Sequence, residues 1–239
     1  MLGLWLPAGE TPSFLFFDSY LQTYLERDLR QVLNVLNLRD FQRLMIACAT
    51  RVGSLVNFAD LARDTGVSPK TAKGWLHVLE ATGIVYLLPP YYRSLGKRLT
   101  KAPKLYFADH GLLCHLVNAG NQSHWETHLM CGQLWENFVL CELIKTRRLK
   151  MGTDLFYYQD QNAVEIDFVV DLQHQIELIE AKRSEHTNPK KLNFSKIRKL
   201  FKQPKVRCLL LCNTEQRQPL VLKNYVLLNP LYVEPVVPS

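Results

Sequence analysis

Residues 165–182 have the sequence EIDFVVDLQHQIELIEAK, in which two largely apolar stretches, 165–171 and 176–182, are separated by only four residues. This length and pattern predict a β-hairpin. If the turn pairs odd-numbered residues of the first strand with even-numbered residues of the second, Asp167 lies opposite or diagonal to Glu180, with about 5–8 Å between their side-chain origins. A slip of one residue would put the two carboxylates on opposite faces, so the prediction depends on the register.

Two carboxylates on one face of a buried strand pair require a compensating charge. Mg²⁺ and Mn²⁺ prefer carboxylate oxygens, so Asp167 and Glu180 are the expected ligands of such an ion. Lys182 points the same way as Glu180, and its ammonium group can position a water molecule or offset charge on a phosphate. Glu136, on an upstream helix, can complete the site. The alternative is a salt bridge on a solvated hairpin, which the apolar neighbours of these residues disfavour.

The chain from Asp167 to Lys182 contains the motif D-(x)₁₂-E-x-K, and Glu136 precedes it on a predicted helix. This arrangement resembles the PD-(D/E)XK superfamily of nucleases from about Gly132 onward. The resemblance implies catalytic roles for Asp167, Glu180 and Lys182, and a metal held by Asp167, Glu180 and Glu136. The expected elements follow the order αβββαβ: a helix at 129–148, strands at 154–159, 164–171 and 175–182, a basic helix at 189–201, and strands at 206–212 and 225–228.

The N-terminal half has the helix-capping residues that are typical of a helix–turn–helix. Asn57 can cap a helix at 58–64, and Ser68 with Pro69 is a strong start for a second helix, which ends at Gly83. Strands expected at 84–88 and 104–107, joined by a basic loop, extend this pattern to a winged helix. Further helices are expected at 16–35, from Asp40 to Ala47, and at 109–117.

Several other segments resemble the region that follows the ATPase core in a large family of prokaryotic AAA-type ATPases. They are YLQTYLERD (20–28), LPPY (88–91), KRL (97–99), KLYFADHGL (104–112) and GQLWENFV (132–139). In that family a P-loop domain precedes a winged helix and the C-terminal domain of unknown function 4143, which has a nuclease-like fold. This chain contains no G-x-x-x-x-G-K-[ST] sequence, so no bound nucleotide and no ATP hydrolysis are expected. It is either a piece of a longer protein or a remnant that has lost its motor domain.

The predicted fold class is therefore α+β or mixed, with an N-terminal helical and winged-helix domain followed by an α/β restriction-endonuclease-like domain. The expected limits are 1–37 for an apolar segment and helix that link to the missing ATPase domain, 38–119 for the winged helix and 120–239 for the PD-(D/E)XK domain.

The net charge of +7 and the pI near 9.1 favour an anionic partner, most simply DNA. The segment 182–207 carries ten Lys or Arg residues against one acid, and a second basic set, which includes Lys104, lies in the expected wing and recognition helix. The candidate DNA-binding residues are Lys70, Lys73, Arg93, Lys97, Arg98, Arg183, Lys190, Lys191 and Arg198. Charge runs are also typical of solvated helix faces, and winged helices also bind proteins. Tyr91 and Tyr92 can stack on bases or fill a domain interface.

The six cysteines form no CxxC pair and no zinc-ligand spacing, which indicates reduced thiols in a cytoplasmic protein. No apolar run approaches the length of a membrane span, so no membrane partner is expected. The oligomeric state stays open.

Two functions remain. The first is a Mg²⁺- or Mn²⁺-dependent phosphodiesterase that acts on DNA. The second is an inactive module with a nuclease-like fold that binds DNA or a protein partner.

Overall fold

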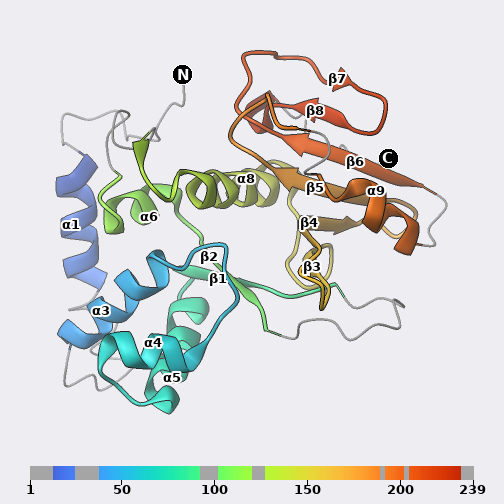
Figure 1. The fold of residues 1–239 in the computed structure, drawn as a ribbon. Helices are drawn as coiled ribbons and strands as arrows, with labels where there is room; N and C mark the ends of the chain where they lie inside the picture. The colour runs from blue at the N-terminus through green and yellow to red at the C-terminus, as the bar shows by residue number, and fades with distance from the viewer. Residues whose placement is uncertain are drawn as a thin grey trace. The chain divides into compact units, whose positions relative to one another are not determined.

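The computed structural model describes residues 13–24, 38–91, 102–119, 127–188, 192–201 and 205–232, and shows a mixed α/β protein with two sheets (Figure 1). The chain divides into two compact units. The first comprises Met1–Tyr86 and Leu105–Leu134, and the second comprises Leu87–Lys104 and Trp135–Ser239. A segment from the middle of the sequence thus belongs to the same unit as the C-terminal half.

The first unit is mainly helical. Its elements are α1 (Ser13–Thr23), α3 (Leu38–Ala49), α4 (Phe58–Thr65), α5 (Pro69–Ala81) and α6 (His110–Leu116), with parts of the two-stranded sheet formed by β1 (Val85–Leu88) and β2 (Lys104–Phe107). The interior between α3, α4 and α5 is apolar, with Phe41, Leu44, Leu61, Leu76 and Leu79 all buried. Most of the helices expected in this half are confirmed, whereas residues 25–37 of the first one lie outside the described residues.

Local sequence signals set the ends of α4 and α5. The Asn57 side-chain oxygen accepts a hydrogen bond from the backbone N–H of Ala59 at 3.0 Å, and the Ser68 hydroxyl accepts one from Thr71 at 3.0 Å. Each side chain satisfies an N–H that the first turn of its helix leaves without a partner. Gly83 follows α5 with φ of 73°, a conformation that glycine adopts without strain. Both predicted caps are confirmed.

A six-stranded sheet with the order β3-β4-β5-β6-β8-β7 forms the centre of the second unit. Its elements are α8 (Cys131–Arg147, of which the part from Trp135 belongs to this unit), β3 (Leu155–Gln159), β4 (Glu165–Asp171), β5 (Ile176–Ala181), α9 (Phe194–Ile197), a 3-10 turn at Arg198–Leu200, β6 (Val206–Leu211), β7 (Leu220–Val221) and β8 (Val226–Leu228). The expected order of one helix, three strands, a helix and a strand is confirmed, and β7 was not expected.

The hairpin of β4 and β5 has the register on which the candidate site depends. Phe168 pairs with Ile179 and Val170 pairs with Glu177, so odd-numbered residues face even-numbered ones. The strands are antiparallel, whereas β5 and β6 run parallel. The predicted condition for bringing Asp167 beside Glu180 is therefore met.

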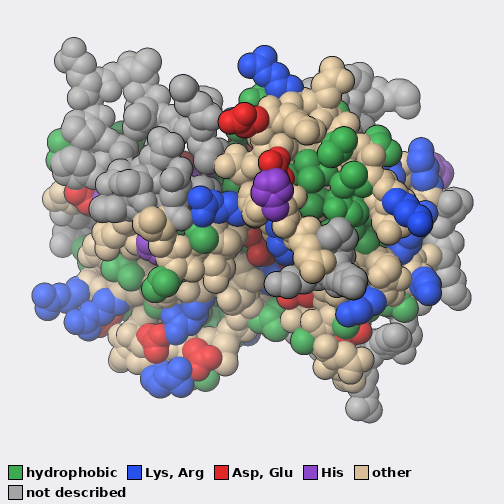
Figure 2. All heavy atoms as spheres, turned by 45° about the horizontal axis from the view of Figure 1, so that its top comes forward, with side chains coloured by type: hydrophobic (Ala, Val, Ile, Leu, Met, Phe, Trp, Pro, Cys, Tyr) green, Lys and Arg blue, Asp and Glu red, His purple; other side chains and the backbone are tan. Residues whose placement is uncertain are grey.

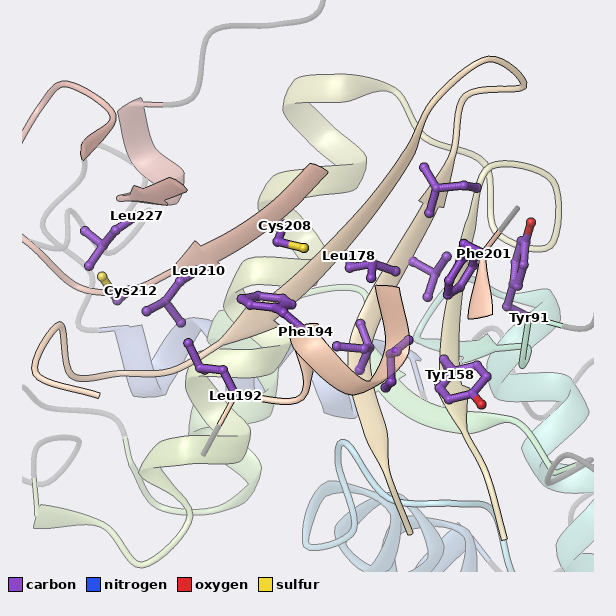
Figure 3. Packing of buried hydrophobic residues seen from close by; sticks show 14 residues of the cluster. Tyr91, Tyr158, Leu178, Leu192, Phe194, Phe201, Cys208, Leu210, Cys212 and Leu227 are labelled. Atoms are coloured by element: carbon purple, nitrogen blue, oxygen red, sulfur yellow. The ribbon is translucent and has the colours of Figure 1, made fainter. Parts of the chain in front are cut away.

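Each face of this sheet packs against a different helix. Leu178 of β5 and Leu210 of β6 lie in a buried cluster with Phe194 and Ile197 of α9 and with Phe201 (Figure 3). Neighbouring strand residues point to opposite faces. On the other face, Glu177 of β5 pairs with Arg147 of α8 at 2.6 Å, and the indole N–H of Trp135 donates to the Leu211 carbonyl at 3.1 Å.

The basic helix expected at 189–201 is much shorter in the structure. It comprises only the four residues of α9 and the 3-10 turn, because both of its ends are held by other interactions. At its start, the Asn193 amide donates to the Glu165 carbonyl of β4 at 3.0 Å instead of capping the helix. At its end, Phe201 is buried in an extended conformation.

None of the helices in the described part of the chain is long and apolar enough to cross a membrane.

Candidate functional site

Asp167 of β4 and Glu180 of β5 lie where the strand pairing between β4 and β5 ends. The last paired residues are Phe168 and Ile179. Beyond them, the backbone N–H of Ala181 donates to the Asp167 carboxylate oxygen Oδ2 at 2.7 Å. Both carboxylates are buried, with 6% of Asp167 and 3% of Glu180 exposed. The hairpin thus positions two carboxylates side by side in the interior of the second unit.

Lys182 bridges these two carboxylates. Its Nζ lies 3.0 Å from Oδ2 of Asp167 and 2.9 Å from Oε2 of Glu180. The backbone N–H of Asn193, just before α9, approaches Oε1 of Glu180 at 3.4 Å. The Lys182 side chain is 37% exposed, so Lys182 is the member of this cluster of Asp167, Glu180 and Lys182 that reaches solvent.

Burial and the neighbouring charges both affect the ionisation of the cluster. Burial, and then the neighbouring Asp167 carboxylate, raise the pKa of Glu180 from 4.5 to about 7, although Lys182 opposes the shift. Burial also disfavours the charged form of Lys182, but the carboxylates of Asp167 and Glu180 outweigh it and raise the pKa of this lysine above its ordinary value. Lys182 therefore stays charged at neutral pH, while Glu180 is poised to gain or lose a proton.

A second lysine, Lys104 at the start of β2, lies next to this cluster. Only 3% of it is exposed, its Nζ is 3.2 Å from Oε1 of Glu136, and it also forms an ion pair with Glu165. Burial disfavours its charged form, but Glu136, Asp167 and Glu165 outweigh that effect and raise the pKa of Lys104. Its expected place in an exposed basic set of the wing is wrong, because it is buried and paired with carboxylates.

The charges of the combined cluster do not balance. Among the described residues it contains four carboxylates, those of Glu136, Glu165, Asp167 and Glu180, and two ammonium groups, those of Lys104 and Lys182. With all six ionised, the formal charge is −2, which is the charge that one divalent cation neutralises. Among the described residues, no group of three or more His, Cys, Asp or Glu side chains is arranged to hold a metal ion. Asp167 and Glu180 are therefore the donors to consider, while Glu136 is paired with Lys104.

The structure separates the predicted DNA-binding residues into three sets. Lys70 and Lys73 are exposed on α5 in the first unit, whereas in the second unit Arg198 is exposed and Arg183 is half-buried. Arg93, Lys97, Arg98, Lys190 and Lys191 lie outside the described residues. Further exposed basic residues near α9 are Lys196, Lys199 and Lys205. Figure 2 shows Lys and Arg side chains gathered at the right of the view, beside a hydrophobic area.

Tyr91 belongs to the core of the second unit. Its hydroxyl donates to Oδ2 of Asp171 at 3.0 Å, and its ring packs against Phe201 at 5.4 Å between centroids (Figure 3). Because only 2% of Tyr91 is exposed, the idea that it stacks on bases is wrong. Tyr92 lies outside the described residues.

Glu177 forms another buried ion cluster that the sequence patterns did not indicate. Its carboxylate is 2.6 Å from Arg147 and 3.4 Å from Arg207, and it accepts a hydrogen bond from Gln175 at 3.0 Å. Arg147 and Glu177 are each only 3% exposed at the side chain. With its charge satisfied by two arginines, Glu177 ties α8 to the sheet and leaves no open position for a ligand.

The protein is thus a two-unit mixed α/β protein, with the charged cluster around Asp167, Glu180 and Lys182 inside its second unit. The chain belongs to a family described as Domain of unknown function (DUF8612), whose model matches residues 4–123. Residues 131–232 match Domain of unknown function (DUF4143), which confirms the C-terminal domain expected from the sequence resemblance.

Two similar proteins are "Uncharacterized protein Rv2008c" of Mycobacterium tuberculosis and "Uncharacterized protein Mb2031c" of Mycobacterium bovis. Each is 33% identical over 190 residues, which cover 76% of this chain and 42% of the relative. The chain thus spans less than half the length of these curated relatives. No solved structure gives a significant match.

Proposed function

We propose that the second unit is a PD-(D/E)XK-type nuclease-like domain that hydrolyses phosphodiester bonds of DNA with Mg²⁺ or Mn²⁺. The observation that carries the proposal is the placement of Asp167, Glu180 and Lys182. Two buried carboxylates lie on neighbouring antiparallel strands, with one ammonium group in contact with both. In the same proposal, the helix–turn–helix of α4 and α5 belongs to a winged helix that helps to hold DNA.

The chemistry of the cluster fits a hard divalent cation. Asp167 and Glu180 offer carboxylate oxygens, and the formal charge of −2 over the described groups is the charge that one divalent cation neutralises. Mg²⁺ is usually held by one or two carboxylates together with substrate phosphates and water, so a third protein carboxylate is not required. When bound, the ion would supply Lewis acidity at the phosphate and a lowered pKa for a bound water.

Lys182 is the residue suited to act on the phosphate itself. Hydrolysis adds the oxygen of one water molecule to phosphorus and breaks one bond from phosphorus to a sugar oxygen, which leaves with a proton as a hydroxyl group. The extra negative charge that develops on the phosphate is stabilised by an ammonium group fixed beside it. Because its pKa is raised, Lys182 remains a proton donor in hydrogen bonds rather than a base.

Basic residues near α9 are well placed to bind the phosphate backbone. Asn193, which precedes α9, contacts both Glu180 and the Glu165 carbonyl. The exposed Lys196 and Arg198 follow within five residues of Asn193. Such contacts fix the position of a strand without reading its sequence, which suits a nuclease with little base preference.

A cleavage assay tests the proposal. Wild type, Asp167→Asn, Lys182→Met and the control Glu185→Gln are incubated with supercoiled and linear DNA in Mg²⁺, Mn²⁺ or EDTA. Glu185 is exposed and lies three residues beyond Lys182, so its variant controls for the loss of one nearby charge. We expect metal-dependent cutting by wild type and control, and a loss of about 100-fold or more in the two site variants. Equal cutting by all four proteins would contradict the proposal.

One observation favours the second candidate function, an inactive module that binds DNA or a protein. Each of the four carboxylates of the cluster is paired with Lys104 or Lys182, so internal cations already stabilise the site without a metal ion. DNA titrations at several salt concentrations distinguish the two functions. Binding that weakens steeply with salt, without cleavage in any metal, supports a DNA-binding module, and the absence of both favours a protein partner.

A further inference from the structure

Lys104 is held in the candidate site by contacts within the second unit. Its Nζ pairs with Glu136 of α8 and with Glu165 of β4, and it lies 5.7 Å from the centre of the Tyr157 ring. At the side chain it is only 4% exposed, and all four residues of β2 are buried. A lysine in such surroundings is a fixed part of the interior rather than a surface residue that moves freely.

The two lysines divide the four carboxylates into two pairs. Lys182 contacts Asp167 and Glu180, whereas Lys104 contacts Glu136 and Glu165. Lys182 is more than a third exposed at its side chain and can turn towards solvent or a substrate. Lys104 has no such freedom, because a buried ammonium group that leaves its carboxylates loses both its solvation and its partners. Glu136 and Glu165 are therefore committed to Lys104.

We propose that Lys104 is a built-in cation that takes the place of a second metal ion, so that the site accepts one divalent cation, at Asp167 and Glu180. This inference rests on the proposed function, from which the identity of the ion as Mg²⁺ or Mn²⁺ comes. It removes Glu136 from the metal ligands expected from the sequence and makes it a positioning residue for Lys104. Neutralising Lys104 removes the cation that Glu136 and Glu165 share, and their carboxylate oxygens are of the kind that Mn²⁺ prefers.

Counting bound Mn²⁺ tests this role without any measurement of activity. The full chain is titrated with Mn²⁺, and the free ion is followed by electron paramagnetic resonance. We expect one ion per chain for wild type and two for Lys104→Met, which keeps the length of the side chain without its charge. Lys104→Arg, which retains the positive charge, and the double variant Lys104→Met with Glu136→Gln are both expected to bind one.

A second comparison covers the case in which Lys104→Met does not fold. If Glu136 is not a ligand of the ion, Glu136→Gln still binds one Mn²⁺ at saturation, whereas Asp167→Asn binds none. Loss of the ion in Glu136→Gln overturns the inference, and so does a folded Lys104→Met that binds the same number of ions as wild type.

Failure of the proposed nuclease function can be told apart from failure of the inference on Lys104. If wild type binds one Mn²⁺ that Asp167→Asn abolishes, but cuts no DNA, the nuclease proposal fails and the role of Lys104 stands. If wild type binds no Mn²⁺, the inference of one divalent cation at Asp167 and Glu180 is overturned together with the metal dependence of the proposed function.

Discussion

Relative to wild type, a Glu180→Gln variant should gain stability as the pH rises from acidic to alkaline values. The folded state holds the pKa of Glu180 at about 7, against an ordinary value of 4.5. Between these two pH values the folded protein retains a proton that the unfolded chain has released, so the stability of wild type falls as the pH rises through this window. Glutamine removes the titration, and with it the loss.

The size of the effect follows from the same pKa difference. A shift from 4.5 to about 7 corresponds to about 3 kcal/mol of free energy of unfolding, lost by wild type between those pH values and absent in Glu180→Gln. Below pH 4.5 the carboxyl group is protonated in both folded and unfolded wild type, so its ionisation contributes no difference from the variant. The burial of Glu180, which is only 3% exposed, is the main cause of the shift.

Urea unfolding of wild type and Glu180→Gln at about pH 5 and about pH 8, without divalent metal, measures this difference. We expect the variant to gain about 2 to 3 kcal/mol relative to wild type on going to the higher pH, because a part of the loss has already occurred at about pH 5. The exposed Glu185→Gln serves as the matched control and should show no such gain. A difference between variant and wild type that does not change with pH, or a relative loss by the variant at about pH 8, would refute the reasoning.

Three further predictions concern stability and DNA binding. Arg147→Met leaves the buried Glu177 without its nearest cation and should lower the free energy of unfolding, measured in urea, by about 3 kcal/mol. The double variant Arg147→Met with Glu177→Met should recover most of this loss. Equal losses in the single and the double variant would contradict the prediction. Ser68→Ala removes the cap of α5 and should lower the free energy of unfolding by about 1 kcal/mol. An unchanged urea midpoint would refute this prediction. If DNA binds near α9, Lys196→Ala with Lys199→Ala should reduce the slope of log affinity against log salt by about 2, and an unchanged slope places the DNA elsewhere.

Much of the local structure could be predicted because its causes are close together in sequence. The caps Asn57 and Ser68 act on N–H groups two or three residues away. In the hairpin, a four-residue connection joins two largely apolar strands in a register that pairs Phe168 with Ile179 and so brings Asp167 towards Glu180. A short connection leaves few registers in which the apolar residues stay buried.

Lys104 and Tyr91 could not be placed from the sequence, because their partners are distant along the chain. Lys104 meets Glu136 and Glu165, and the Tyr91 hydroxyl meets Asp171, eighty residues later. The available signal was the apolar context of Lys104, since a lysine within a wholly buried strand needs a carboxylate partner.

The predicted length of the basic helix was wrong because contacts with distant residues also limit this helix. The positions of Phe194, Ile197 and Phe201 have helical spacing, and all three residues are buried. The Asn193 side chain, however, is committed to the Glu165 carbonyl, and Phe201 is extended. Tertiary contacts thus limit a helix that its own periodicity would extend.

The most direct test of the metal site is a crystal structure of the protein grown with Mn²⁺, with anomalous scattering used to locate the ion. We expect one anomalous peak per chain, bound by carboxylate oxygens of Asp167 and Glu180, with Lys104 still paired with Glu136. Crystals with saturating Mn²⁺ but no peak at Asp167 and Glu180 would contradict a metal-dependent nuclease site in this protein.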